Sequence, residues 1–384
     1  MTLTEKLQLA ADIGVTLPHF SNTDNPIDFP VTAKKSERKM ATLRRIDIIE
    51  PIDGADAIEV ATVGGWKVVV KKNEFAVGDL AIYCEIDSFI PTTIAPFLTK
   101  PDNYPKVFEG VEGERLRTVR LRGQLSQGLL LPLSVVLNGL TIEQRFVFAQ
   151  SEGADVSEQL NIRKYEAPIP ACLAGEVKGM FPGFIPKTDQ ERIQNLTKEL
   201  LDWKRLGYTW EVTEKLDGTS MTSFTLDGVF SICSRNLELK PHADNSMFKA
   251  AAAQDLENKL LSTGRNLALQ GELIGNGIQG NKYKMTGQFF YVFDIYDIDA
   301  KRYMTPWERK AFVTKHDIKH VPVFKSTEKL LESDDSASLL RCAEGKSVMG
   351  DITGPEREGL VYKCNEAEVS FKAISNKFLL KNGE

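Results

Sequence analysis

The sequence predicts an α+β protein in two parts, a β-rich N-terminal part followed by a part with mixed strands and helices. The chain of 384 residues is longer than one typical compact unit, so two domains are expected. Short runs of Val and Ile alternate with turn signals from residue 41 to about 140, whereas strand-like and helix-like runs follow each other irregularly after residue 207. No glycine-rich loop follows a strand, which argues against a Rossmann or P-loop fold.

The β-rich part begins after residues 1–39, which we interpret as an extension with a polar stretch and a basic patch. Its short strand-like runs are separated by signals such as Gly64-Gly65 and Val77-Gly78-Asp79, and this spacing is typical of a small barrel or sandwich. The runs cover residues 44–49, 58–63, 66–70 and 81–86.

The run Arg115–Gly123 alternates arginine with apolar residues. One strand face would carry Arg115 and Arg117, and Arg120 and Arg122 would continue a basic surface. A solvated strand face is the usual explanation, but small barrels that bind oligonucleotides also follow phosphate backbones in this way.

Residues 150–186 are irregular and rich in Pro and Gly, which indicates a linker. A helix is predicted from a Thr188 or Asp189 cap through Leu200. Further strands are predicted around Lys215 and at 229–234, 267–273, 288–295, 359–363 and 368–372, and helices at 247–261, 306–315 and 328–343.

Composition excludes several classes of protein. Charged residues make up 26% and hydrophobic residues 42%, as in soluble globular proteins, and neither a membrane-spanning run nor a secretory segment is recognisable. Five cysteines without paired spacing predict reduced thiols in an intracellular protein. Four scattered histidines argue against a His-based hydrolase or a zinc enzyme, and the net charge of −5 argues against indiscriminate nucleic-acid binding.

The segment Glu211–Ser220 carries the strongest chemical signal. Lys215 stands two residues before Asp217-Gly218, between two strand-prone runs. A lysine that loses its proton is a nucleophile, and a neighbouring carboxylate can hold a metal, so the pair suits attack on phosphorus. A solvated Asp-Gly turn beside a surface lysine is the commoner explanation of this string alone.

Four further strings follow in order: Arg235 at the end of a strand, Glu272 and Glu358 each beside an apolar run, and Lys372 in a final strand. A glutamate within an apolar strand is costly to bury without a cation, so each one could equally form a structural ion pair. Five such strings in this order are harder to explain in that way.

Together they resemble the motifs of the covalent nucleotidyltransferase superfamily, which contains polynucleotide ligases and mRNA capping enzymes. Lys215 matches motif I, Arg235 motif Ia, Glu272 motif III, Glu358 motif IV and Lys372 motif V. The run Phe289–Tyr296 resembles motif IIIa, which implies that Phe293 stacks on the adenine.

The order of the parts resembles the ATP-dependent RNA ligases with an N-terminal OB-fold. Only a dozen residues follow Lys372, too few for the C-terminal OB-fold of DNA ligases and capping enzymes. The resemblance implies an OB-fold at 40–150, a linker at 151–186 and a ligase-type nucleotidyltransferase domain of antiparallel sheets with flanking helices at 187–384. One departure concerns motif V, where Lys372-Ala373-Ile374 lacks the second lysine, and Lys377 is a candidate replacement.

The resemblance further implies a lysyl-AMP on Lys215, transfer of AMP to a 5′-phosphate RNA end, and sealing by a 3′-OH, on RNA ends or a nicked duplex, by a monomer. Mg²⁺ or Mn²⁺ would be held by Asp217, Glu272 and Glu358. The implied ATP contacts are Lys215, Gly218, Arg235, Phe293, Val361, Lys372, Arg192 and Gln194, and the RNA contacts are Arg115, Arg117, Arg120 and Arg122. The alternatives are a DNA ligase, a capping-type guanylyltransferase or a non-catalytic OB-fold protein that binds nucleic acid.

Overall fold

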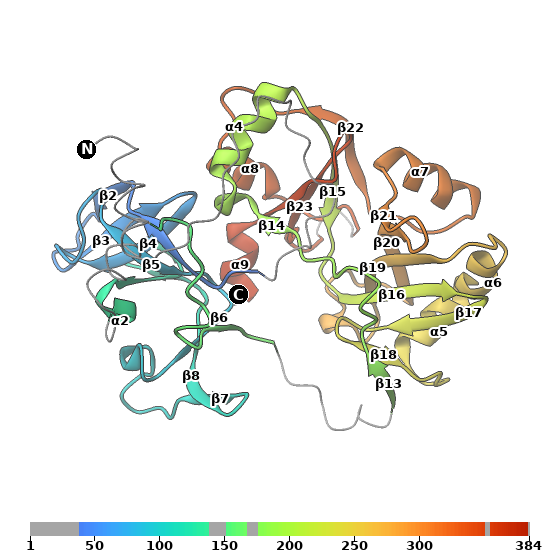
Figure 1. Cartoon of the computed structure of the whole chain (residues 1–384), viewed down its shortest axis with the longest axis horizontal. Coiled ribbons are helices and arrows are strands. Elements are labelled where there is room, and N and C mark those ends of the chain that lie inside the picture. The colour runs from blue at the N-terminus through green and yellow to red at the C-terminus, as the bar shows by residue number, and fades with distance from the viewer. Residues whose placement is uncertain (1–37, 138–150, 167–175, 350–353, 383–384) are drawn as a thin grey trace, which may run out of the picture. The chain divides into compact units, whose positions relative to one another are not determined.

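A computed structural model of the chain describes residues 38–137, 151–166, 176–349 and 354–382 (Figure 1). The predicted N-terminal extension therefore lies outside the described residues except for Arg38 and Lys39. Within these ranges, no helix has the length and apolar character that a membrane crossing requires.

The N-terminal part is built from short strands in small sheets, which enclose two apolar clusters, one of them around Leu43, Ile82 and Ile90. Buried residues Val156, Leu160 and Ile162 join that cluster, so residues beyond 150 pack on these strands. The sheets are β1(Ala41–Arg45)-β5(Leu80–Cys84)-β11(Leu129–Pro132), β2(Ile48–Pro51)-β3(Ile58–Val63)-β4(Trp66–Lys71), β10(Gln124–Gln127)-β9(Thr118–Leu121) and β12(Arg163–Lys164)-β6(Ser88–Pro91)-β8(Val111–Arg115)-β7(Lys106–Phe108), and short helices are η1(Pro96–Leu98) and α2(Ser134–Leu137).

The second part contains a seven-stranded sheet whose apolar residues pack against three helices, α5(Ser246–Ala253), α6(Leu256–Leu261) and α7(Pro306–Lys315). Its long strands bury alternate residues on the helix side, among them Leu267, Leu269 and Leu273. The strand order is β13(Val177–Met180)-β18(Leu237–Leu239)-β17(Val229–Cys233)-β16(Thr219–Leu226)-β19(Leu267–Gly275)-β20(Gln288–Asp297)-β21(Arg302–Tyr303), with η4(Gln279–Asn281) after β19.

A five-stranded sheet completes the second part, and helices α4(Thr197–Leu206) and α8(Ser336–Ala343) pack on it through Leu200, Leu339 and Leu340. The strand order is β14(Glu191–Arg192)-β24(Ser370–Ile374)-β23(Gly359–Cys364)-β15(Thr209–Lys215)-β22(Val323–Lys329), and η3(Ile193–Asn195) and α9(Asn376–Asn382) are the remaining helices. All pairings between the named strands are antiparallel except β14 with β24. The predicted α+β class with antiparallel sheets is confirmed.

Three predicted helices were misplaced. The helix at 247–261 is two helices, because Asp255 adopts a left-handed φ of 54° between α5 and α6. Residues 328–329 end strand β22, and helix α8 begins only after the capping side chain of Asp335. The helix expected from residue 188 starts at Thr197, because residues 191–192 instead pair with β24.

The predicted single strand over Arg115–Gly123 is also divided. Arg115 ends β8, whereas Thr118 begins β9, and these strands belong to different sheets. The alternation of buried and exposed residues holds from Leu116 to Thr118 and ends at Val119 and Arg120, which are adjacent and both exposed. The arginines therefore do not share one strand face.

Candidate active site

The connection between β15 and β16 carries the chain from the five-stranded sheet to the seven-stranded sheet (Figure 1). Lys215 is the last residue of β15, and Thr219 is the first of β16. Gly218 in this connection lies so close to β19 that a Cβ atom would stand 2.3 Å from the Leu273 carbonyl oxygen. Only glycine, which lacks a Cβ atom, fits this close approach. The approach brings residues of both sheets together around Lys215.

Glu358 is the direct ionic partner of Lys215. Lys215 Nζ lies 2.6 Å from Glu358 Oε1, and Glu358 immediately precedes β23, whose Gly359 is opposite Lys215. Burial acts to lower the pKa of Lys215, but the charges of Glu358, Glu272 and Asp217 and the bond with Glu358 raise it above its usual value. In this arrangement Lys215 is an ammonium ion and has no free electron pair.

Glu272 is the second carboxylate beside Lys215. It lies in β19 and accepts a hydrogen bond of 3.0 Å from the backbone N–H of Gly218. Burial raises the pKa of Glu272 to about 8, and the negative charges of Glu358 and Asp217 add to the effect that Lys215 opposes. A further negative charge beside Glu358 and Asp217 is thus disfavoured in this arrangement.

Asp217 forms an ion pair with Lys282, and its backbone N–H donates a 2.8 Å hydrogen bond to the Tyr283 hydroxyl oxygen. The sequence analysis missed Lys282 and Tyr283. They lie 65 and 66 positions along the chain from Asp217, in a segment with no pattern that pointed to the site.

Several predicted nucleotide contacts share one face of the five-stranded sheet. Val361 in β23 is opposite both Thr213 in β15 and Lys372 in β24, and Lys372 is next to Arg192 in β14. Directly opposite residues point to the same side, and Thr213 is two residues from Lys215, so all these side chains lie on the Lys215 face. Burial and the charges of Arg38 and Arg192 hold the pKa of Lys372 well below its usual value.

Phe293 occupies a β-bulge in β20. Gln270 is opposite Asp294 and Gly271 is opposite Val292, which leaves Phe293 without a partner on β19. A bulge changes the direction of a side chain, and Phe293 packs in a cluster that contains Leu216, the residue after the candidate nucleophile. Lys363 Nζ stands 5.5 Å from the centre of the Phe293 ring. The bulge and Lys363 therefore define the position of the aromatic side chain, and no local pattern in the sequence indicated either of them.

Arg235 lies beside Asp189, at a nitrogen–oxygen distance of 3.0 Å, and near Glu166. Burial acts to raise the pKa of Asp189, but the cations Lys372, Lys164 and Arg235 lower it strongly. Asp189, one of the two residues predicted as a helix cap, thus forms ion pairs with Arg235 and Lys164 and also feels the charge of Lys372.

Arg192 and Gln194 lie where the second part of the chain contacts the N-terminal strands. Arg192 is buried beside Glu85 and Asp87, at 3.6 and 3.4 Å. Gln194 is 1% exposed, and neither polar atom of its amide has a hydrogen-bond partner among the described residues. Gln194 is thus available to a polar ligand, whereas Arg192 already has carboxylate neighbours.

This chain has Ile374 at the second lysine position of motif V, so an apolar side chain stands where a charged one was expected. Ile374 is buried in the cluster that contains Trp66 and Tyr83 of the N-terminal strands. Lys377 points elsewhere, because its side chain is exposed and pairs with Glu344 at 2.8 Å.

The four arginines of the N-terminal part have different surroundings. Arg115 pairs with Asp87 at 2.6 Å, and its guanidinium lies over the Tyr165 ring, so its role is at least partly structural. Arg117, Arg120 and Arg122 are exposed.

The donors around Lys215 fit a hard divalent cation. Three carboxylates, Asp217, Glu272 and Glu358, act on this one lysine, and oxygen is the ligand that Mg²⁺ and Mn²⁺ prefer. Among the described residues, no three His, Cys, Asp or Glu side chains are grouped tightly enough to enclose an ion. A metal bound here would thus keep water or substrate oxygens in its coordination shell.

Comparisons with known proteins agree with this geometry. Residues 40–133 match a family model described as an OB-fold domain, and residues 208–375 match the RNA ligase family model. No curated protein matches the chain. Among solved structures, an RNA ligase of Naegleria gruberi with PPi is 44% identical, covers 89% of this chain and 98% of its own, and superposes with a TM-score of 0.78.

The chain belongs to the RNA ligase family. Forms of the Naegleria ligase with AMP and Mn and with ATP and Mn, both mutants, match at the same identity and coverage, with TM-scores of 0.79 and 0.78. The chain is therefore an enzyme that forms phosphodiester bonds, with an N-terminal OB-fold and a ligase domain of antiparallel sheets, as its sequence predicted.

Proposed function

We propose that this RNA ligase seals a 3′-OH end to a 5′-phosphate end through an AMP carried on Lys215. Its cofactors are ATP and a divalent cation, in keeping with the ATP, AMP and manganese of the matched Naegleria structures. The observation that carries the proposal is a lysine at the junction of two sheets, with three carboxylates near it and a buried lysine, Lys372, on the same face.

In the first step Lys215 Nζ attacks the α-phosphorus of ATP. A P–N bond forms, the bond from the α-phosphorus to the bridging oxygen breaks, and pyrophosphate leaves. The attacking nitrogen must first lose a proton, which the three carboxylates oppose by raising its pKa. A cation bound to these carboxylates would weaken their attraction for the ammonium proton and so favour the neutral amine of Lys215.

In the second step an oxygen of the RNA 5′-phosphate attacks the same phosphorus, and the P–N bond breaks to free Lys215. In the third step the 3′-OH attacks the activated 5′-phosphate, and AMP leaves. Phosphoryl transfer depends mainly on positioning and on charge stabilisation. Lys372 would bind the α-phosphate, and Arg235 would bind phosphate or ribose after leaving Asp189.

Asp217, Glu272 and Glu358 would hold the divalent cation, directly or through water. When bound, the cation supplies Lewis-acid stabilisation of charge on the phosphate oxygens. Because the Lys215 and Lys282 ammonium groups now pair with Glu358 and Asp217, metal binding would compete with these two ion pairs.

The nucleobase would lie between Phe293 of the bulge and Val361 of β23, with Gly218 close to the nucleotide. Aromatic rings stack on nucleobases, and the facing aliphatic side chain excludes water. Gln194 offers one donor and one acceptor, the pattern that an adenine edge requires. Arg192 would contribute positive charge beside Lys372.

The OB-fold would hold the RNA next to the break. The enzyme would act as a monomer, on free RNA ends or on a nicked duplex. The exposed arginines Arg117, Arg120 and Arg122 are available to phosphates. Arg115 would contribute through the fold, because it is paired with Asp87.

The test is incubation of wild type and Lys215→Ala with α-labelled ATP and Mn²⁺ or Mg²⁺, followed by denaturing electrophoresis. We expect a labelled wild-type band that the mutant lacks, and no label from α-labelled GTP. Mass spectrometry of the purified wild type excludes AMP already bound. Labelling of a folded Lys215→Ala protein would overturn the proposal.

A further inference from the structure

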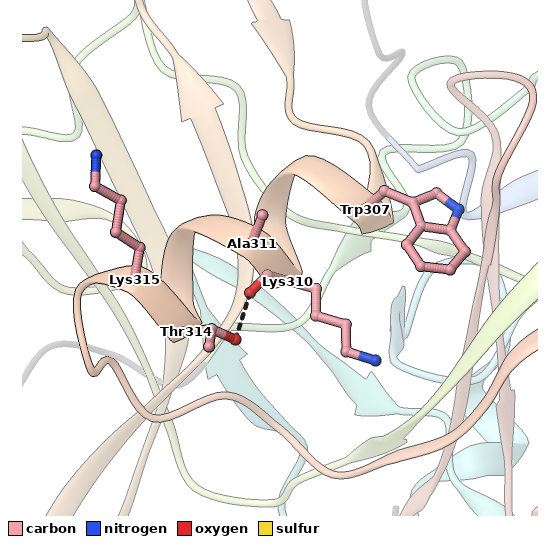
Figure 2. A pocket seen from close by; sticks show the side chains of 5 residues that line it. All are labelled: Trp307, Lys310, Ala311, Thr314 and Lys315. Carbon is pink, nitrogen blue, oxygen red and sulfur yellow. Dashed lines mark hydrogen bonds between the residues drawn. The ribbon is translucent and has the colours of Figure 1, made fainter.

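One face of helix α7 lines a hollow on the surface of the ligase domain (Figure 2). The helix is fixed by a capping box between Thr305 and Glu308 and buries Arg309, Phe312 and Val313 on its inner side. The hollow has a volume of about 400 Å³ and is lined from the outer side by Trp307, Lys310, Ala311, Thr314 and Lys315.

Trp307 stands at one end of this face with 58% of its surface exposed, and Figure 2 shows its indole directed away from the helix. A single exposed apolar residue is common and by itself indicates nothing. Here, however, the indole is accompanied by Lys310 and Lys315, and neither ammonium forms an ion pair within the described part of the chain.

The nearby acids are already neutralised by other cations. Glu308 pairs with Arg302 at 2.8 Å, and Asp317 lies 3.8 Å from Lys259. Lys310 and Lys315 therefore leave this face with net positive charge, which complements a polyanion.

A second hollow of about 400 Å³ adjoins the first, because Lys310 and Thr314 line both. It continues between α7 and Val323 of β22 and reaches Glu211 of β15. Glu211 precedes Lys215 by four residues, about 13 Å along a strand. Glu211 is buried, so an RNA strand that leads from Lys215 to this face would pass over the surface and span more than about four nucleotides, at ~3.4 Å for each stacked nucleotide.

We propose that Trp307, Lys310 and Lys315 form a second RNA-binding surface, on the ligase domain, for a single-stranded part of the substrate. The indole stacks on one unpaired base, and the two lysines bind flanking phosphates. An acidic protein is the less favoured partner, because the substrate of this enzyme family, RNA, is already a polyanion. The inference rests on RNA being the substrate.

The test compares full-length wild type, Trp307→Ala, Trp307→Phe and the double variant Lys310→Glu/Lys315→Glu. Self-adenylation with labelled ATP reports on the active site. Fluorescence anisotropy measures affinity for a single-stranded RNA, and sealing is measured with RNA ends whose single-stranded flanks are either shorter or longer than about four nucleotides.

We expect unchanged adenylation in every variant. Loss of one stacked base should weaken RNA binding about five- to 150-fold in Trp307→Ala, whereas Trp307→Phe should retain affinity because phenylalanine also stacks. The double variant should bind RNA more weakly and reduce the salt dependence of log K by about 1.4. Sealing should fall mainly for long flanks.

The matched control is Lys198→Glu/Lys301→Glu, which makes the same change in net charge at exposed lysines on other elements. Equal weakening by this control, or unchanged affinity in Trp307→Ala, would overturn the inference. So would displacement of RNA by polyglutamate at equal charge, which would indicate an acidic protein partner. Loss of adenylation in wild type would instead contradict the proposed function.

Discussion

Lys215 Nζ and Glu358 Oε1 lie 2.6 Å apart, although 143 positions separate the two residues in the sequence. This pair keeps the candidate nucleophile protonated until the site receives its substrates. Glu358 thus has two proposed roles, as a partner of the resting lysine and as a metal ligand. Glu358→Ala should reduce self-adenylation by at least about a hundredfold, because positioning and charge stabilisation would both be lost.

The measurement is the rate of label incorporation from α-labelled ATP, with thermal unfolding as a check on folding. Glu356→Ala is the matched control, because Glu356 also pairs with a lysine, Lys346 at 2.7 Å, but is on the surface two residues away. It should adenylate at the wild-type rate. Full labelling by a well-folded Glu358→Ala protein would remove Glu358 from the mechanism.

Arg117 and Arg120 should affect the RNA steps alone. Both are exposed on the OB-fold, so Arg117→Ala/Arg120→Ala should slow sealing while self-adenylation stays at the wild-type rate. The comparison uses single-turnover sealing of an RNA by pre-adenylated enzyme, at two salt concentrations. Arg163→Ala, at an exposed arginine paired with Glu109, serves as control. Equal loss of both activities would assign the two arginines to the fold.

The sequence indicated the residues that carry the chemistry of the site, but it did not indicate the residues that surround them. Lys215, Glu272, Glu358 and Lys372 could be selected because each stands beside a short apolar run, a pattern that one segment reveals by itself. Lys282 and Lys363 could not be selected in this way. Each meets the site only because two sheets converge, and such contacts between distant segments leave no local pattern.

Predicted helix boundaries were wrong for a related reason. Residues 188–200 have good capping and helical spacing, yet Asp189 binds Lys164 at 2.7 Å and Arg192 pairs in β14. Tertiary ion pairs and sheet pairing outweighed local propensity. The helix over 306–315, whose cap and buried face agree with its local pattern, was predicted with the bounds that the structure has.

Stability should depend on pH through Lys363. Burial lowers the pKa of Lys363 to about 8, against the opposing charge of Asp294 at 2.7 Å. An unfolded lysine titrates near pH ~10.4, so between about pH 8 and 10.4 the unfolded chain binds a proton that the native chain has released. The resulting increase in the free energy of unfolding is therefore complete above the unfolded pKa and is lost as the pH falls to about 8.

The free energy of unfolding of wild type should accordingly rise relative to that of Lys363→Met by up to ~1.4 kcal/mol per pH unit in this window. Urea unfolding of both proteins at several pH values measures the difference. Lys325→Met, at an exposed lysine, should show no such trend. A constant difference between wild type and Lys363→Met across the window would contradict the prediction.

Arg309 is the buried cation that joins helix α7 to both sheets of the ligase domain. It is 1% exposed, forms an ion pair with Glu211 of β15, and lies 3.5 Å from Asp294 of β20. Its Nε also donates a 3.0 Å hydrogen bond to His320 Nε2. Arg309→Met should destabilise the protein by about 3–5 kcal/mol, because Glu211 would remain buried without its cation.

Arg302→Met tests whether burial is the cause, since Arg302 makes an exposed ion pair with Glu308 of the same helix. It should cost no more than ~1 kcal/mol. The double variant Arg309→Met/Glu211→Leu should recover much of the loss, since neither charge then remains unpaired. Urea unfolding measures all three variants. If Arg309→Met and Arg302→Met cost the same, the buried network does not hold the two sheets together.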